Sequence, residues 1–236
     1  MDTPVWGIIG AMEEELSTLK KESVFSETVT IADMEFCVGT LHGAKLVLVQ
    51  SGMGKVNAAI CAQILISRFG VNRIINTGVA GSLDARIDIG DIVVSVDAVQ
   101  HDFDVSPIGF ARAEIPYTGL RYFPADEGLR QAALRAIRKA VPEIGVFEGS
   151  VCSGDQFIAS REAKDQILSN FSGLCCEMEG AAIAQTCYLN HVPFVILRAI
   201  SDKADDSEEV AFETFKHSAA QHCAAVIQCM LAENKA

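Results

Sequence analysis

The segment RIINTGVAGS, residues 73–82, begins as an apolar run and ends in small residues and glycines. Such a pattern indicates a buried strand that leads into a glycine-rich loop. A second stretch, VWGIIGA at residues 5–11, has the same form. Continuous apolar strands are typical of sheets that helices cover on both faces. The two stretches therefore favour an α/β fold.

Strands and helices alternate outward from these two stretches, and we expect one α/β domain over residues 1–236 with a mixed, largely parallel sheet. Residues 106–124 hold three of the six prolines and indicate a long irregular loop or lid. Further strands are expected within 27–52 (three strands, with turns near 32–33 and 42–43), 90–105, 145–152, 172–176 and 193–201. Helices are expected at 12–22, 54–70, 126–141, 161–169, 178–190 and 209–232.

Composition limits the class of protein. Half of the 236 residues are hydrophobic, which allows a sizeable core. No apolar run reaches the ~18 residues of a membrane helix, and the apolar start lacks the basic region of a signal peptide. The net charge of −12 opposes binding to a nucleic-acid backbone. We therefore expect a cytoplasmic protein whose partner is a small molecule, with no nucleic acid and no membrane.

Eight cysteines lie in apolar surroundings, and none forms a CxxC pair. In a cytosolic chain they are most simply buried reduced thiols. The histidines lack the spacing of helical metal ligands, and we expect His217 and His222 on the surface of the last helix. The sequence therefore predicts no metal site.

Five polar or glycine-rich segments follow expected strands. Ligands of open α/β sheets bind beyond the carboxyl ends of the strands, so these segments are candidates for one site. Each also has a structural explanation: Glu15 as a solvated helix acid, Glu179 as a partner of a helix dipole, Asp202 as a helix N-cap, and Gly78 and Gly81 as turn glycines. The five segments are GAMEEE (10–15), NTGVAGS (76–82), SGDQFI (153–158), CEMEG (176–180) and AISDKAD (199–205).

Three carboxylates around one pocket suit the departure of a heterocyclic base from a sugar. The transition state carries positive charge on the sugar ring, which nearby anions stabilise. One acid can protonate the leaving base while another activates water, as in glycoside hydrolysis. The third can accept hydrogen bonds from sugar hydroxyls.

Eight segments, in order along almost the whole chain, resemble the nucleosidase branch of the purine nucleoside phosphorylase and uridine phosphorylase family. The resemblance implies a three-layer αβα domain and hydrolysis of the N-glycosidic bond of 5′-methylthioadenosine and S-adenosylhomocysteine, in methionine salvage. It also implies no cofactor, an adenine nucleoside as partner, and a homodimer in which the segment after HDFDV reaches the neighbouring subunit. The segments are GIIGAMEEE, SGMGKVNAA, NTGVAGSL, GDIVVS, HDFDV, SGDQFI, EMEGAAIA and RAISDKAD.

The family pattern implies a role for each matching residue. Glu15 would act as general base on the attacking water, and Glu179 would bind the ribose hydroxyls. Asp202 would donate a proton toward N7 of adenine, in a buried site that raises its pKa. Ser201 would support Asp202, and Arg198 would order the water.

The remaining matches imply contacts with the nucleoside, and Glu177 is left unassigned, either as a supporting residue or as a solvated acid. Departures also occur: Val79 stands where family members often carry Ser, which removes a hydroxyl near the water. On the alkylthio side of the pocket, where members often have aromatics, the run here is SPIGF, with Ile108 and Phe110. The implied contacts are Phe157 stacked on the purine, the Ile158 backbone at the base edge, Met178 under the sugar, Ala80 and Gly81 near ring and sugar, and Met53 in the 5′-alkylthio pocket.

Two other enzyme classes and a binding protein are alternatives. Phosphorylases of this family carry arginines near the first strand and before the glycine segment, where this chain has Glu13–Glu15 and Asn76. Anions there repel phosphate, which favours water as nucleophile. A non-catalytic nucleoside-binding protein would be expected to lose one of the acids. A nicotinamide enzyme ranks last, because the GxGxxG spacing is absent.

Overall fold

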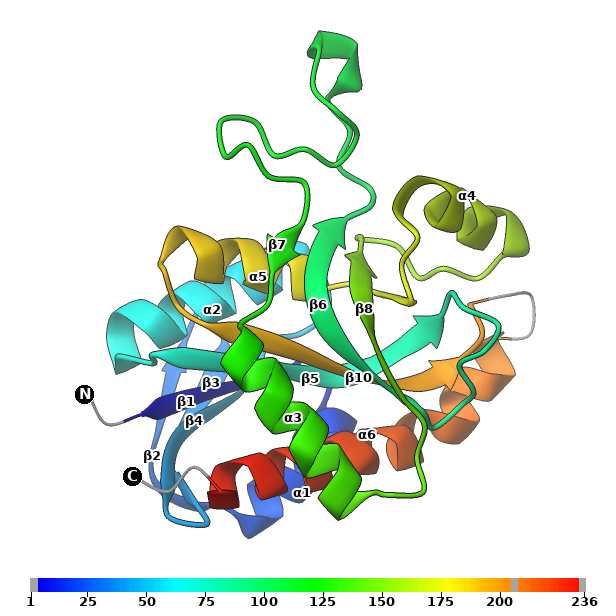
Figure 1. The fold of residues 1–236 in the computed structure, drawn as a ribbon. Coiled ribbons are helices and arrows are strands. Elements are labelled where there is room, and N and C mark those ends of the chain that lie inside the picture. Colours follow the sequence, from blue (N-terminus) through cyan, green and yellow to red (C-terminus); the bar gives the residue numbers. More distant parts are fainter. Residues whose placement is uncertain (1–3, 205–207, 234–236) are drawn as a thin grey trace.

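A mixed sheet with helices on both faces dominates the computed structural model (Figure 1). The structure describes residues 4–204 and 208–233, without the side chains of residues 208–211. The strands are β1 (Val5–Gly10), β2 (Val24–Ile31), β3 (Met34–Leu41), β4 (Ala44–Gln50), β5 (Arg73–Ser82), β6 (Ile92–Gln100), β7 (Phe123–Pro124), β8 (Val146–Ser153), β9 (Cys175–Glu177) and β10 (Phe194–Asp202). The helices are α1 (Glu13–Glu22), α2 (Lys55–Phe69), α3 (Glu127–Ala140), α4 (Arg161–Phe171), α5 (Gly180–Leu189), α6 (Glu208–Glu233) and the short 3₁₀ helix η1 (Ser106–Ile108).

The sheet curls on itself. Strands β5, β1 and β4 run parallel, and β10 lies parallel to β5 on its other side. Strand β10 also pairs with β6, which leads through β8 and β9 back to β5, so these five strands close a ring. The expected mixed sheet is confirmed, but antiparallel pairing is as common as parallel pairing among the described strands. Strands β2, β3 and β4 pair antiparallel because tight turns at 32–33 and 42–43 connect them.

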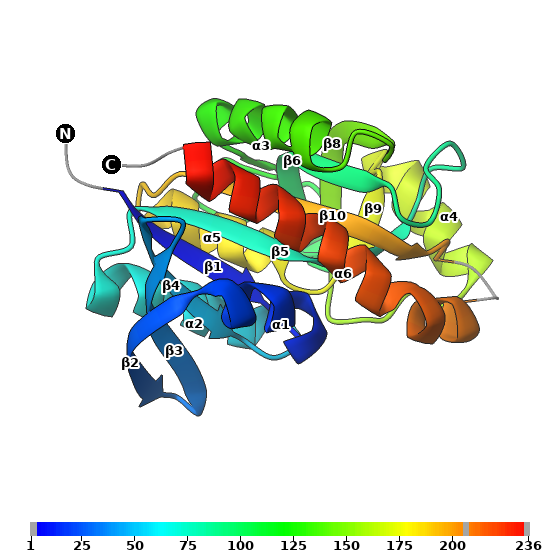
Figure 2. The same ribbon diagram turned by 90° about the horizontal axis from the view of Figure 1, so that it is seen from below.

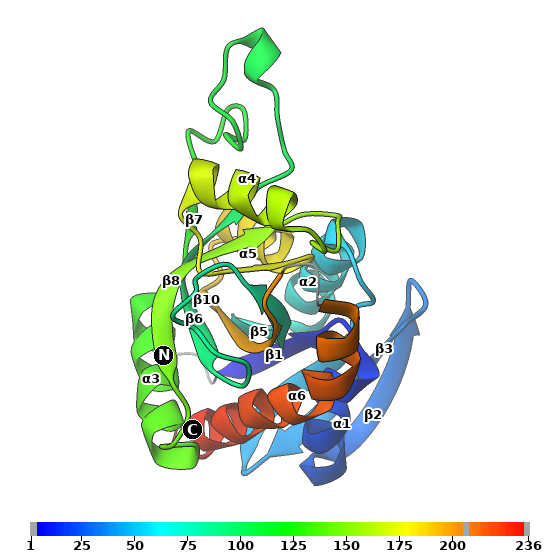
Figure 3. The ribbon, with the colours of Figure 1, turned by 90° about the vertical axis from the view of Figure 1, so that its right-hand side faces the viewer.

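Helices cover both faces of the sheet, as the three-layer expectation requires. Helices α1, α3 and α6 share one hydrophobic core with the strands, and α2 and α5 share a second core on the opposite face. Figure 2 shows α6 crossing the strands with α1 and α3 beside it. Figure 3 shows the two helix layers on either side of β1 and β5, with α4 set apart near β8. A third small cluster underlies α4.

The sequence analysis expected the glycine-rich segment 76–82 to be a loop. It is instead the second part of strand β5. Its glycines make room for side chains. A Cβ on Gly78 would lie 2.0 Å from Nη1 of Arg198, and one on Gly81 would lie 2.7 Å from Oδ1 of Asp202. The alternative role of these glycines in a turn is therefore also wrong.

Residues 101–122 form an arm that projects from the body of the molecule between β6 and β7 (Figure 1). The arm carries η1 and an isolated bridge between Ile115 and Leu120, but is otherwise irregular. Exposed apolar side chains lie along it, including Ile108 and Tyr117. The predicted irregular loop is thus present. Ala113, Ile115 and Leu120 pack against the body of the molecule, and no residue of 101–122 lines the cleft described below, so the loop is not a lid over it.

The structure agrees only in part with two expectations about side chains, the burial of the cysteines and the exposure of two histidines. Seven of the eight cysteines are buried as predicted, whereas Cys229 is only partly buried, and all eight are free thiols. His217 is exposed on α6, but His222 is half-buried with Nδ1 3.0 Å from the Gly90 carbonyl oxygen. Among the described residues, no helix is long and apolar enough to cross a bilayer.

Candidate active site

A cleft opens where the carboxyl ends of several strands meet. About 570 Å³ of space free of atoms lies in and at the mouth of this cleft, open solvent included. All five segments singled out in the sequence contribute to its wall. Of the eleven residues named from the sequence, ten line it: Glu15, Met53, Ala80, Gly81, Phe157, Ile158, Met178, Glu179, Ser201 and Asp202.

Glu15 enters the cleft from the first turn of α1. Its side chain is buried, with the residue only 3% exposed, so it is not a solvated helix acid. Its Oε2 accepts hydrogen bonds from the N–H groups of Ala11 (2.7 Å) and Met12 (2.9 Å), and Oε1 accepts one from Val79 (3.0 Å). Burial raises the pKa of Glu15, although Arg198 and the three backbone donors oppose the shift. A carboxylate held this way is a better proton acceptor than an exposed one.

Asp202 lies at the end of β10, beside a β-bulge. The register with β5 shifts between Ile200 and Asp202, so that Asp202 pairs with Gly81 and its side chain reaches the cleft. Ser201 donates from Oγ to Oδ2 of Asp202 over 2.8 Å, and the Ala204 N–H donates to Oδ1 over 3.0 Å. Ser201 thus contacts Asp202 through a direct hydrogen bond.

Glu179 stands at the N-terminus of α5 and faces α2. Its Oε1 accepts a 2.8 Å hydrogen bond from the N–H of Gly54, the residue before α2. Burial, followed by the charge of the adjacent Glu177, raises the pKa of Glu179 to about 7. This carboxyl group thus lies in the cleft with capacity left to accept further hydrogen bonds.

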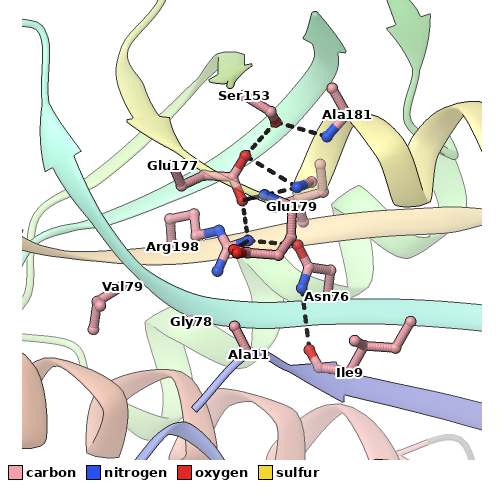
Figure 4. A network of polar contacts seen from close by, with 12 residues as sticks. Ile9, Ala11, Asn76, Gly78, Val79, Ser153, Glu177, Glu179, Ala181 and Arg198 are labelled. Atoms are coloured by element: carbon pink, nitrogen blue, oxygen red, sulfur yellow. Dashed lines mark hydrogen bonds and ion pairs between the residues drawn. The ribbon is translucent and has the colours of Figure 1, made fainter. Parts of the chain in front are cut away.

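Arg198 is the one predicted residue that does not line the cleft. It lies buried behind the acids, where its Nη2 donates to Asn76 Oδ1 over 2.6 Å and to Glu177 Oε2 (Figure 4). Glu179 Oε2 is 3.7 Å from the same nitrogen. Burial lowers the pKa of Arg198, but Glu177, Glu179 and Glu15 together outweigh it and raise that pKa. The guanidinium therefore stays charged and partly neutralises the acids.

Apolar side chains form the other wall of the cleft. Phe157 is 53% exposed, and its ring meets that of Phe212 edge-on with centroids 5.6 Å apart. Ile158 is buried beside it, and Met178 lines the cleft between the two acids of β9 and α5. Met53 is exposed at the rim. Such a wall suits a flat ring with apolar faces.

Sequence reasoning missed several residues of this site. Glu177, left without a role, is buried and central to the polar network, while Ser153 and Asn76 bind it and Arg198. Phe212 lines the cleft but lies in an ordinary helical pattern, so no local signal marked it, and Cys176 lies in the segment 176–180 but was given no role. For Glu177 a signal existed, because an acid between a buried strand and a buried helix needs partners.

Comparisons with known proteins agree with this geometry. The sequence profile of the phosphorylase superfamily matches residues 6–232. A 5′-methylthioadenosine/S-adenosylhomocysteine nucleosidase of Anoxybacillus flavithermus is 42% identical over 227 residues, covering 96% of this chain and 97% of that protein. This chain belongs to the phosphorylase superfamily, in its methylthioadenosine/S-adenosylhomocysteine nucleosidase family. The family resemblance is thereby confirmed.

Solved structures support the same family. The nucleosidase of Colwellia psychrerythraea in complex with adenine has a TM-score of 0.94 and 36% identity, covering 98% of this chain and 96% of the other. Futalosine hydrolase of Helicobacter pylori, at 33% identity, has a TM-score of 0.92 and covers 98% of each chain. This family member therefore has the nucleoside phosphorylase-like fold expected from the sequence.

Proposed function

We propose that this family member hydrolyses the N-glycosidic bond of 5′-methylthioadenosine and S-adenosylhomocysteine, releasing adenine and the 5′-thioribose. One observation carries the proposal: Glu15, Glu179 and Asp202 come from three separate elements and line one cleft. The relatives named above support the choice of substrates, since they are nucleosidases for these two compounds. The apolar side chains that line the same cleft suit a purine.

In the proposed reaction, a water oxygen bonds to C1′ of the ribose while the C1′–N9 bond breaks. The bonding electrons pass into the purine, which takes a proton at N7 from Asp202. Glu15 accepts a proton from the water, and its raised pKa suits that task. Glu179 accepts hydrogen bonds from the ribose hydroxyls, and the acids stabilise the positive charge that develops on the sugar.

The charge of the cleft favours water over phosphate as the nucleophile. Four acids, Glu15, Glu177, Glu179 and Asp202, are among the described residues lining the cleft, and neither Lys nor Arg is. Arg198 lies behind them and already binds Glu177. A phosphate dianion needs cationic or N–H donors and would meet carboxylates instead.

Adenine release, measured with and without inorganic phosphate, tests the proposal. We expect equal rates in both conditions and a free 5′-thioribose as product. Strict dependence on phosphate with a ribose-1-phosphate product would establish a phosphorylase instead. The assay should include 5′-deoxyadenosine and aminodeoxyfutalosine, because a structural relative is a futalosine hydrolase.

We also propose that residues 1–236 act as one catalytic domain and that two copies form a homodimer. The profile match over residues 6–232 supports the first proposal. The projecting arm with Ile108 and Tyr117 supports the second, because exposed apolar side chains favour a protein partner. A cytoplasmic location agrees with eight free cysteines. A role in methionine salvage agrees with the sulfur-containing substrates.

A further inference from the structure

Glu177 lies at the centre of the polar network in Figure 4, yet the reaction just described gives it no task. Its side chain is 3% exposed, and its carboxylate accepts hydrogen bonds from four groups. Those donors are Arg198 Nη2, Ser153 Oγ, and the N–H groups of Glu179 (3.1 Å) and Gly180 (2.8 Å). A buried acid with this many donors is held in one orientation.

We propose that Glu177 is a positioning residue that binds Arg198 and thereby keeps it from donating a hydrogen bond to the sugar-binding acid, Glu179, with which Nη2 forms only a longer ion pair. The inference rests on the proposed function. Nη2 of Arg198 carries two hydrogens, and Asn76 and Glu177 accept both. Glu179 Oε2, at 3.7 Å from Nη2, is left as a neighbouring charge without a hydrogen bond from that nitrogen.

Two further contacts fix the geometry around Arg198. Asn76 is itself held, since its Nδ2 donates to the Ile9 carbonyl over 3.1 Å. Gly78 allows the guanidinium to lie across β5, where a Cβ would overlap Nη1 of Arg198 at 2.0 Å and Oε1 of Glu15 at 2.5 Å. The charge of Arg198 thus acts on both Glu15 and Glu179. Because Glu177 fixes the orientation of the guanidinium, it also sets how strongly that charge acts on each of these two acids.

Glu177 also fixes the backbone that carries Glu179. Its carboxylate accepts the first N–H groups of α5, and Ser153 Oγ accepts the N–H of Ala181 over 2.7 Å while donating to Glu177. The free N–H groups at a helix start favour a carboxylate there. Helix capping alone is therefore a competing, purely structural explanation, and the test must distinguish the two.

The pH profile of the reaction addresses that distinction, because groups on several elements shift the pKa of Glu179. Glu177 on β9 and Glu15 on α1 raise the pKa of Glu179, after burial, while Arg198 on β10 and the Gly54 N–H at the start of α2 lower it. Lys55, next to Gly54, binds Asp102 instead. Removing the charge of Glu177 and freeing Arg198 both shift the pKa of Glu179 down.

The experiment compares Glu177→Gln, Glu177→Asp, Ser153→Ala and, as a matched acid-to-amide control, Asp97→Asn, a half-buried carboxyl group on β6 outside the cleft. Adenine release is measured from pH 4 to 9 together with the melting temperature. For Glu177→Gln we expect a roughly 10- to 100-fold lower kcat and an acid limb of the kcat/KM profile about half a pH unit or more lower. Glu177→Asp keeps the charge and should keep the wild-type acid limb.

Ser153→Ala retains every charge and serves if Glu177→Gln does not fold. It should lower kcat several-fold with an unchanged acid limb, because Glu177 loses one of its holding contacts. A wild-type acid limb in folded Glu177→Gln, or wild-type kcat in Ser153→Ala, would overturn the inference. Wild-type protein that releases no adenine would instead count against the proposed function.

Discussion

Two of the buried carboxylates of this site, Glu15 and Asp202, are each held by several hydrogen-bond donors. Glu15 has three backbone N–H partners, and Asp202 has Ser201 and Ala204. An unpaired carboxylate in such surroundings would cost several kcal/mol. The arrangement orients the acids before any ligand arrives, so a small chemical change at one of them should affect turnover more than binding.

Asp202→Asn tests that expectation at the scale of one residue. Asparagine keeps the shape and can accept the Ser201 hydrogen bond, but it cannot deliver a proton to the leaving base. We expect kcat to fall by about 10²–10⁴-fold, with adenine affinity, measured by calorimetry, changed only slightly. Equal losses in turnover and affinity would indicate a binding role for Asp202 and would favour a non-catalytic nucleoside-binding protein.

At the scale of elements, strand ends and helix starts meet in the cleft. Strand β4 leads into the start of α2, where Gly54 has φ 95° and ψ 158° and donates its N–H to Glu179. That combination of angles is open essentially to glycine alone. The backbone at Gly54 therefore links the position of α2 to that of Glu179, the proposed sugar-binding acid just before α5.

Gly54→Ala should cost about 1–3 kcal/mol of unfolding free energy and also raise KM, because the strained N–H moves away from Glu179. Gly43→Ala is the matched control: Gly43 also has positive φ, at 88°, but lies in the β3–β4 turn with no atom near its absent Cβ. It should lose stability with an unchanged KM. Denaturant unfolding and adenine-release kinetics measure the two effects, and parallel KM changes in both variants would refute the link.

For the whole molecule, the buried network carries an excess of negative charge, because Glu15, Glu177 and Glu179 surround the single cation Arg198. The pKa of Glu179 is raised from 4.5 to about 7, so the folded protein binds more protons than the unfolded chain between these values. The stabilisation that Glu179 provides is complete below pH 4.5 and is lost as pH rises through about 7. The site thus reduces the stability of the folded protein at neutral pH and above.

Glu179→Gln should remove that dependence. We expect the variant to be nearly inactive but more stable than wild type at pH 8, by on the order of 1–3 kcal/mol, with little difference at pH 4.5. Urea unfolding at several pH values measures this. Glu22→Gln, at an exposed position on α1, should keep the wild-type slope. If Glu179→Gln had the same stability as wild type at pH 8, the buried charge of Glu179 would not be what destabilises the folded protein there.

The arm belongs to the same scale, because its side chains Ile108 and Tyr117 are left largely exposed by the rest of the described chain. Ile108→Asp should shift the proposed dimer toward monomer in light scattering while leaving the monomer's fold intact. Val24→Asp is a matched control, since Val24 on β2 and Ile108 are both 73% exposed. Equal assembly of the two variants would show that the arm does not mediate the contact.

The sequence by itself determined the order and type of the elements, because apolar periodicity and turn residues act locally. It also marked Glu15, Glu179 and Asp202, since all three lie in polar segments at the ends of expected buried strands and match the family pattern. The tertiary structure alone decided that 76–82 is strand, that β5 and β10 join across a curled sheet, and that Glu177 binds Arg198. Those outcomes depend on contacts between residues far apart in the chain, such as Gly78 beneath Arg198, for which a local pattern carries no signal.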